Sequence, residues 1–246
     1  MKLKEMNAAL QWLREKYAVQ ADGVLAASAE GSIGAAAELK MNNGTLVKLL
    51  PWRIERRFVE LKKIIDGKTL EGVSTLRFAW MVSDKALEKL LYRELDLCAY
   101  LGESEIKSIF AVTNGKTANL VIKLFDGKSC SVECSAALPA GAEEMDRHEI
   151  IARRGVACDR TVDTQVPQAS IYQFTADGEK RFTDIDTELF GFETEEILLI
   201  RAAYAVLSNP ALAAEWNRID AKLIQQTADA LATEKSGKPV IYTKEK

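Results

Sequence analysis

The sequence predicts an α+β fold, in which a partial parallel βαβ segment precedes an open, mainly antiparallel sheet with helices on one face. Two observations predict it. Helix-like and strand-like patterns alternate over residues 1–66, which is typical of a parallel βαβ unit. After residue 70, strands joined by Asn-Gly and Asp-Gly turns precede two closing helices, which is typical of an antiparallel meander. We therefore expect two parts, residues 1–66 and 67–246.

The first part is expected to alternate between helices and strands. Apolar residues recur at steps of three and four where a helix is expected, and short apolar runs mark the strands. An Ala-rich stretch ended by Asn43-Gly44 also favours a helix. The pattern predicts helices over residues 3–19, 31–42 and 54–65, and strands over residues 24–27 and 45–50.

The second part is expected to be strand-rich. Alternation of large apolar and smaller or polar residues over 73–81 predicts a strand with one buried face. Glycine after asparagine or aspartate provides the positive φ angles of tight hairpins, and such dipeptides separate the central strands. The remaining strands are predicted over 108–113, 117–125, 128–136, 148–155, 170–175 and 180–184, with helices over 84–101, 195–208 and 210–232.

Composition and charge exclude several classes of protein. The 246 residues are 48% hydrophobic and 28% charged, as in globular proteins, and are enough to bury a full core. A net charge of −3 without any run of five like charges argues against a nucleic-acid partner. No apolar stretch approaches the ~20 residues that span a bilayer, so we expect no membrane partner. The N-terminus has no apolar signal core, so export is not expected.

The four cysteines are expected to be reduced. Cys98, Cys130, Cys134 and Cys158 contain no CxxC pair, and the single histidine excludes the usual Cys/His zinc patterns. Cys130 and Cys134 share one face of a predicted strand, so packing in the core is favoured over metal ligation. A cytoplasmic protein without a metal is the expectation.

Three stretches together resemble one oxidoreductase family. They are residues 53–62 followed by Gly67 and Gly72-Val73, residues 94–97 followed by Tyr100-Leu101-Gly102, and residues 230–240. In order and spacing the chain resembles the glucose–fructose oxidoreductase and inositol dehydrogenase (Gfo/Idh/MocA) family. The resemblance implies a Rossmann-like nucleotide-binding part, a C-terminal α/β sheet domain, NAD(P)-dependent oxidoreduction and homodimers.

The sequence departs from that family where the cofactor and the proton transfer are concerned. No G-x-G-x-x-G is present, and Gly31-Ser32-Ile33-Gly34 is the nearest pattern. The Glu-Lys-Pro of the family has no lysine counterpart at residues 26–31, and Lys89 and Arg93 stand where the family has an Asp and a His. The resemblance therefore implies a Rossmann-like remnant, half of a nucleotide-binding domain. We expect no cofactor on this chain alone, and NAD or NADP only if a partner chain completes it.

Five residues are candidates for a ligand cleft, each with a plainer alternative. His148 is either a general base or a half-exposed strand histidine paired to a carboxylate. Arg53 either binds a carboxylate or phosphate at the end of a strand or lies at a solvated helix start. Lys89, Arg93 and Asp96 either line a cleft, or Arg93 and Asp96 form a surface ion pair. The polar connector 159–168 either carries a function or only joins strands.

Three functions remain open from the sequence. The favoured one is a protein that is non-catalytic on its own and acts through dimerisation or binding. The second is a subunit of a split NAD(P)-dependent oxidoreductase, completed by a separate nucleotide-binding chain. The third is a module that binds a small anion, such as a sugar acid or a phosphate, through Arg53 and Arg93. Because the strand over 117–125 has apolar residues on both faces, Val121 and Phe125 are expected on an open face that a second copy covers.

Overall fold

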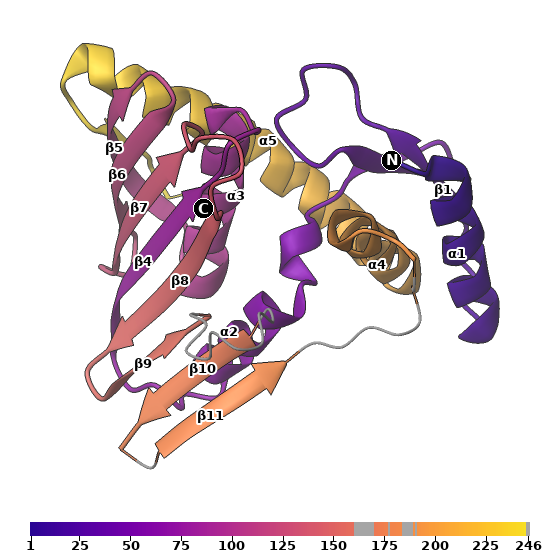
Figure 1. Ribbon diagram of the computed structural model, residues 1–246, viewed down its shortest axis with the longest axis horizontal. Coiled ribbons are helices and arrows are strands. Elements are labelled where there is room, and N and C mark those ends of the chain that lie inside the picture. The colour runs from indigo at the N-terminus through magenta and orange to yellow at the C-terminus, as the bar shows by residue number, and fades with distance from the viewer. Residues whose placement is uncertain (160–169, 177, 184–188, 190, 245–246) are drawn as a thin grey trace. The chain divides into compact units, whose positions relative to one another are not determined.

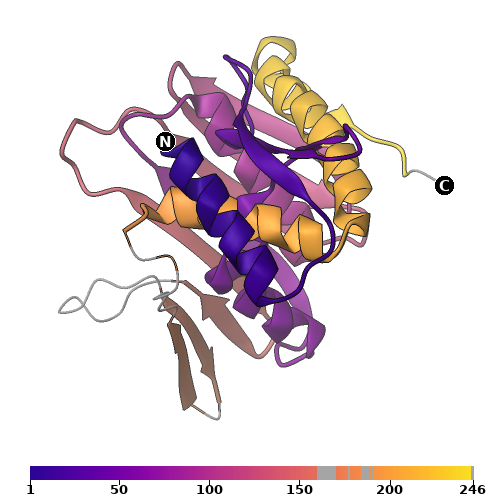
Figure 2. The ribbon, with the colours of Figure 1, turned by 90° about the vertical axis from the view of Figure 1, so that its right-hand side faces the viewer.

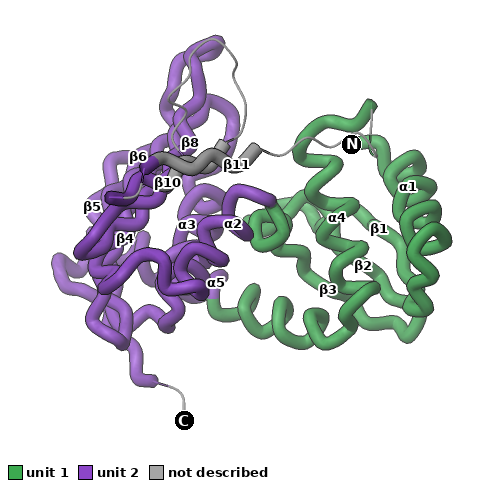
Figure 3. The backbone as a smooth tube through the Cα atoms, turned by 90° about the horizontal axis from the view of Figure 1, so that it is seen from below, with its two compact units in different colours: residues 1–55, 185–222 green, residues 56–184, 223–246 purple. Residues whose placement is uncertain are grey.

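The computed structural model describes residues 1–159, 170–176, 178–183, 189 and 191–244. They belong to two compact units (Figure 3). Unit 1 comprises Met1–Glu55 and Ile185–Lys222, and unit 2 comprises Arg56–Asp184 and Leu223–Lys246. This division differs from the expected one at residue 66. One reason is that the helix Arg56–Asp66 contacts the helix Leu87–Gly102 of the second unit, and another is that a late helix, α4 (Thr194–Ser208), contacts the small sheet of the first unit.

Unit 1 is a three-stranded sheet packed with helices. The helix α1 packs against α4, and the two cross each other in Figure 2. Leu25 of β1, Leu39 of β2 and Val47 of β3 are buried and form one apolar layer of the unit. The elements are α1 (Leu3–Lys16), β1 (Gly23–Ala27), β2 (Ala37–Met41), β3 (Leu46–Lys48), the 3-10 turn η1 (Pro51–Arg53), α4 (Thr194–Ser208) and the first part of α5 (Ala211–Ser236).

The expected helix over 31–42 and the expected parallel βαβ pairing are wrong. Residues Ala37–Met41 form β2, which is antiparallel to both β1 and β3. Ala37, Glu38 and Leu39 are buried in succession between β1 and β3, so tertiary pairing outweighs the helix propensity of the alanines in this stretch. Asn43-Gly44 ends no helix; it turns the chain between β2 and β3, with Gly44 at a φ of +83°.

Asparagine side chains hold both edge strands of the small sheet. Asn7 of α1 donates from Nδ2 to the carbonyl of Leu25 at 3.0 Å, and its Oδ1 accepts the N–H of Leu25 at 2.7 Å. On the other edge, Asn217 donates from Nδ2 to the carbonyl of Leu46 at 2.9 Å, and its Oδ1 accepts the N–H of Lys48 at 2.8 Å. The N–H and carbonyl of Leu25 on β1, and the carbonyl of Leu46 and the N–H of Lys48 on β3, therefore already have partners and are not open to an added strand.

Unit 2 is built around a nine-stranded sheet in the order β11-β10-β9-β8-β4-β7-β6-β5-β12. All neighbouring strands are antiparallel except β4 and β7, and Figure 1 shows the central strands side by side. The α+β class with an open, mainly antiparallel sheet is confirmed. The elements are α2 (Arg56–Asp66), β4 (Val73–Met81), α3 (Leu87–Gly102), β5 (Ile106–Asn114), β6 (Thr117–Leu124), β7 (Ser129–Ser135), β8 (Met145–Ala152), β9 (Gly155–Cys158), β10 (Ser170–Thr175), β11 (Gly178–Thr183), β12 (Val240–Ile241) and the part of α5 from Leu223.

Helix α3 covers one face of this sheet, where it contacts β4, β6 and β7. Along β6 the residues Ala118, Leu120, Ile122 and Leu124 are buried, whereas Val121 between them is 60% exposed. The expected facing of the strand is therefore confirmed. The four cysteines are free and buried, as their apolar surroundings in the sequence indicate. Although α5 has 26 residues, neither it nor another described helix has the length and apolar character needed to cross a membrane.

Candidate functional site

The chain's only histidine lies in the core of unit 2. His148 is on β8, opposite Phe78 of β4, and is fully buried. Its ring meets that of Phe58 from α2 edge-on, with centroids 4.7 Å apart, and lies 4.8 Å from the ring of Phe78. A polar ring placed among aromatic side chains needs partners for both of its nitrogens.

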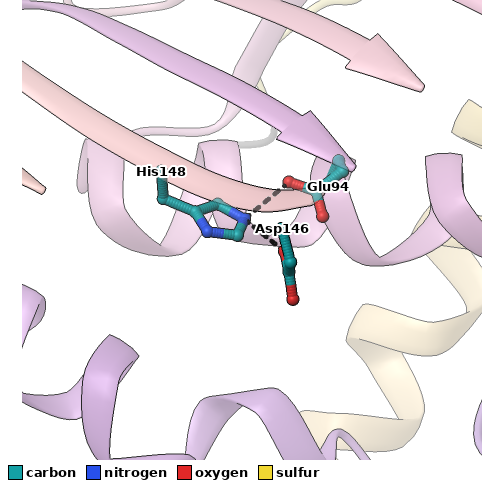
Figure 4. Close-up of side chains that lie close together, drawn as sticks. All are labelled: Glu94, Asp146 and His148. Carbon is teal, nitrogen blue, oxygen red and sulfur yellow. Dashed lines mark hydrogen bonds and ion pairs between the residues drawn. The ribbon is translucent and has the colours of Figure 1, made fainter. Parts of the chain in front are cut away.

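Two carboxylates supply those partners. Nδ1 of His148 lies 2.7 Å from Oδ2 of Asp159. Nε2 lies 3.0 Å from Oε2 of Glu94 on α3, the contact that Figure 4 shows. Burial by itself lowers the pKa of His148, but the Asp159 and Glu94 carboxylates outweigh it and raise the pKa to about 9. Both nitrogens then carry a proton at neutral pH and donate, so the residue is an imidazolium.

Two arginines bind the same group of carboxylates. Arg93 of α3 donates from Nη1 and Nη2 to the two oxygens of Asp146 at 3.0 and 2.5 Å, and from Nε to Glu94 at 2.8 Å. Arg57 of α2 donates to Asp146 at 2.5 Å and to Asp159 at 3.2 Å. Burial alone raises the pKa of Asp146, but the charges of Arg57 and Arg93 hold it well below its usual range.

The six side chains form a charge-balanced cluster, which we call the His148 cluster. Among these six described side chains, three cations match three carboxylates, so their buried charges offset one another. Aromatic rings complete the surroundings: the guanidinium of Arg93 lies 3.3 Å from the ring centre of Trp80, and that of Arg57 lies 4.5 Å from the ring centre of Phe58. The members are Arg57, Arg93, Glu94, Asp146, His148 and Asp159.

Glu94, Asp146 and His148 also lie close enough together to be considered as metal ligands, with one ligand atom of each within 4.8 Å of the others. Their partners fit a metal poorly. A ligating imidazole must offer a lone pair, but both nitrogens of His148 face carboxylates and donate. Arg93 binds both Glu94 and Asp146, so a metal ion would have to lie beside a guanidinium. The arrangement favours an ion-pair network.

The structure brings together two of the five residues that the sequence singled out. Arg93 and His148 share the His148 cluster, whereas Lys89 is exposed on α3 and Asp96 is buried on the same helix. Arg53 belongs to unit 1, where it pairs with Glu215 at 3.5 Å.

Both plainer alternatives for the clustered residues need correction. His148 is paired to carboxylates as one alternative held, but it is fully buried rather than half-exposed. The surface ion pair between Arg93 and Asp96 is wrong, because Arg93 is buried and pairs with Glu94 and Asp146. Burial of α3 on nearly all sides explains the outcome for Arg93.

The sequence reasoning missed four members of the cluster as site residues. Asp146 carried a usable signal, since it stands two residues before His148 and so shares a face of the strand. The sequence offered little to single out the other two. Glu94 is adjacent to Arg93, and Arg57 follows the second predicted strand. Asp159 begins the connector 159–168, and residues 160–168 of that connector lie outside the described residues.

Comparison with known proteins identifies the fold. No protein-family model matches the sequence, and no curated protein matches it significantly. Solved structures do match. An oxidoreductase from Agrobacterium radiobacter, in complex with NAD+, L-tartaric acid and magnesium, has a TM-score of 0.65 at 13% identity over 81% of this chain and 65% of that one. An inositol dehydrogenase homologue from Azotobacter vinelandii, with NADH and myo-inositol, has a TM-score of 0.64 at 12% identity over 82% and 65%.

Levoglucosan dehydrogenase, in complex with NADH and levoglucosan, is similar as well, with a TM-score of 0.61 at 13% identity over 80% of this chain and 66% of that one. The chain thus spans about 65% of the length of the first two structures. The resemblance to Gfo/Idh/MocA-type oxidoreductases is confirmed for the fold.

Proposed function

We propose that the chain is a relative of the Gfo/Idh/MocA oxidoreductases that is non-catalytic on its own and acts as a homodimer in the cytoplasm. One observation carries the proposal. Both ring nitrogens of the only histidine are held by carboxylates, so His148 has no lone pair with which to accept a proton. Arg93, at the position where the family resemblance implies a histidine, is likewise fixed to Glu94 and Asp146.

The segment nearest to a dinucleotide-binding turn supports the same proposal. A pyrophosphate-binding turn requires glycines that lead into the N-terminus of a helix. Gly31-Ser32-Ile33-Gly34 instead leads through an irregular stretch into strand β2. The segment therefore offers no helix N-terminus to a cofactor, and we propose that the chain alone binds neither NAD nor NADP.

The open face of the nine-stranded sheet is the proposed dimer contact. Val112 and Val121 are 59% and 60% exposed on neighbouring strands, and Phe110 lies directly opposite Val121. Lys123 and Glu133, also exposed, add charges of both signs to β6 and β7. A two-fold axis places the same patch against itself, so a mixed apolar and oppositely charged patch is suited to it.

The edge strand β1 of the small sheet argues against the alternative of a split enzyme. A separate nucleotide-binding chain that continued this sheet from β1 would need the free main-chain groups of that strand. Asn7 already holds the N–H and the carbonyl of Leu25. This contact favours a small sheet that ends at β1, and not one that a strand of a partner chain extends.

Two measurements test the proposed function. Light scattering on the intact chain should give twice the 27.2 kDa chain mass at micromolar concentration. Titration with NADH, followed by cofactor fluorescence, should show no saturable binding. Ordinary micromolar affinity for NADH would contradict the non-catalytic assignment, and a monomer at high micromolar concentration would contradict the dimer.

A further inference from the structure

One carboxylate of the His148 cluster sits in a fork made by two guanidiniums. Arg93 contacts both oxygens of Asp146 through separate nitrogens, at 3.0 and 2.5 Å, while Arg57 reaches Oδ2 from a different helix at 2.5 Å. Two arginines that converge on one planar anion are the usual protein site for a carboxylate, because the guanidinium fork matches the two oxygens.

Asp146 differs from the other two carboxylates in its access to solvent. Its side chain is 25% exposed, whereas those of Glu94 and Asp159 are 0% and 1% exposed. It also lies at the second residue of β8, where the strand begins. Of the three carboxylates, only Asp146 stands where an anion from solution can take its place.

The charges of the cluster favour such an exchange. Without Asp146, the three cations of the His148 cluster, including the imidazolium of His148, would face only two of its three carboxylates, those of Glu94 and Asp159. A small anion that entered the vacated position would restore the balance, and partial burial would strengthen the attraction beyond its value in water.

We propose that Arg57 and Arg93 form a carboxylate-binding site that Asp146 fills from within the chain, and that the ligand class of the site is a small molecule with a free carboxylate. Trp80, stacked on Arg93, provides a flat apolar wall, and Lys85 lies 5.9 Å from the ring centre of Trp80 as a further cation. All these residues belong to unit 2, so the inference does not depend on the dimer or on the absence of a nucleotide cofactor.

The intact chain should bind free carboxylates weakly, because an attached carboxylate competes at a high effective concentration. The test therefore removes the attached group. Asp146→Ala is melted in 100 mM sodium formate, sodium acetate, sodium phosphate and sodium chloride at matched ionic strength and pH 7. Glu149→Ala is the control, since Glu149 lies on the same strand and pairs with Arg77 at 3.7 Å.

We expect Asp146→Ala to melt well below the unchanged chain in chloride, and formate or acetate to raise its melting temperature by about 3–6 °C over chloride, as a Kd of about 10 mM predicts. Phosphate should raise it less than formate, because phosphate is larger than the carboxylate group that the substitution removes and carries more charge than the one negative charge that is lost. The unchanged chain and Glu149→Ala should show no difference between formate and chloride.

Three results would overturn the proposal: equal melting of Asp146→Ala in formate and chloride, a larger shift with phosphate, or the same formate effect in Glu149→Ala. If Asp146→Ala does not fold, Asp146→Ser replaces it. This variant keeps a short polar side chain but vacates the position of the carboxylate, so formate must still stabilise it more than chloride does. Failure of Asp146→Ser to show that order would equally reject the site.

Discussion

His148 and Asp159 are joined through both side chain and main chain. Oδ1 of Asp159 accepts the backbone N–H of His148 at 2.6 Å, and Oδ2 lies 2.7 Å from Nδ1 of the ring. The backbone N–H of Asp159 in turn donates to the carbonyl of His148 at 3.2 Å. Because Asp159 directly follows β9, these contacts fix the end of β9 to β8, and their strength depends on the charge of the imidazolium.

Stability should fall at alkaline pH. The folded-state pKa of His148, about 9, is above the unfolded value of about 6.5. Its contribution is therefore fully present below about pH 6.5 and is lost as pH rises through about 9, and it is on the order of 3 kcal/mol. Urea unfolding at pH 6 and pH 9.5 measures it. His148→Gln should remove most of the difference in unfolding free energy between the two pH values. If both proteins lose the same free energy between pH 6 and pH 9.5, another group is responsible.

Loss of the Glu94 charge should destabilise unit 2 strongly. Glu94→Gln leaves Arg93 and the imidazolium with one carboxylate fewer in a buried place, which typically costs about 3–5 kcal/mol. Glu88→Gln is the matched control, since Glu88 is exposed six residues earlier on α3, and should change the free energy of unfolding by less than about 0.5 kcal/mol. Urea denaturation compares the two, and similar losses would rule out the cluster as the cause.

A charge on the open sheet face should dissociate the proposed dimer. Val121→Lys places an ammonium group at the centre of the apolar patch, and two such groups would face each other across a two-fold axis. Light scattering should then report the 27.2 kDa monomer. Leu46→Lys is the control, because Leu46 is 46% exposed on unit 1 and should leave the mass unchanged. A dimeric Val121→Lys would place the contact elsewhere.

The thiols should be unreactive in the folded protein. Cys98, Cys130, Cys134 and Cys158 are all buried, and burial raises the pKa of Cys98 and Cys134 well above its usual value. A thiol reagent at pH 8 should label none of the four within minutes, and all four after denaturation. Mass spectrometry counts the labels. Rapid labelling of Cys130 or Cys134 in the native state would contradict the assigned face of β7.

Local patterns predicted the sheet of unit 2 well and the small sheet less well. Strand β4 has the limits that alternation indicated, and the hairpin turns carry Gly115 and Gly127 at positive φ. The error at residues 31–42 arose because alanines favour a helix locally, whereas the tertiary structure buries Leu39 between two antiparallel neighbours.

Local sequence patterns could not predict the His148 cluster, for a different reason. Glu94 is 54 positions from His148 in the sequence, and Arg57 is 102 positions from Asp159. Contacts at such separation depend on how the helices α2 and α3 pack on the sheet, which periodicity does not specify. The sequence indicated Arg93 and His148 individually, but not that three carboxylates would join them.

The asparagines that hold the edges of the small sheet have a consequence for how the protein behaves when concentrated. An exposed strand edge is a template on which other chains can stack into fibrils, and natural proteins block such edges. Asn7 and Asn217 do so with side chains, because a primary amide presents the same donor and acceptor as a peptide group. Replacing either by a residue without an amide would expose a growth site for aggregates and leave the apolar core unchanged.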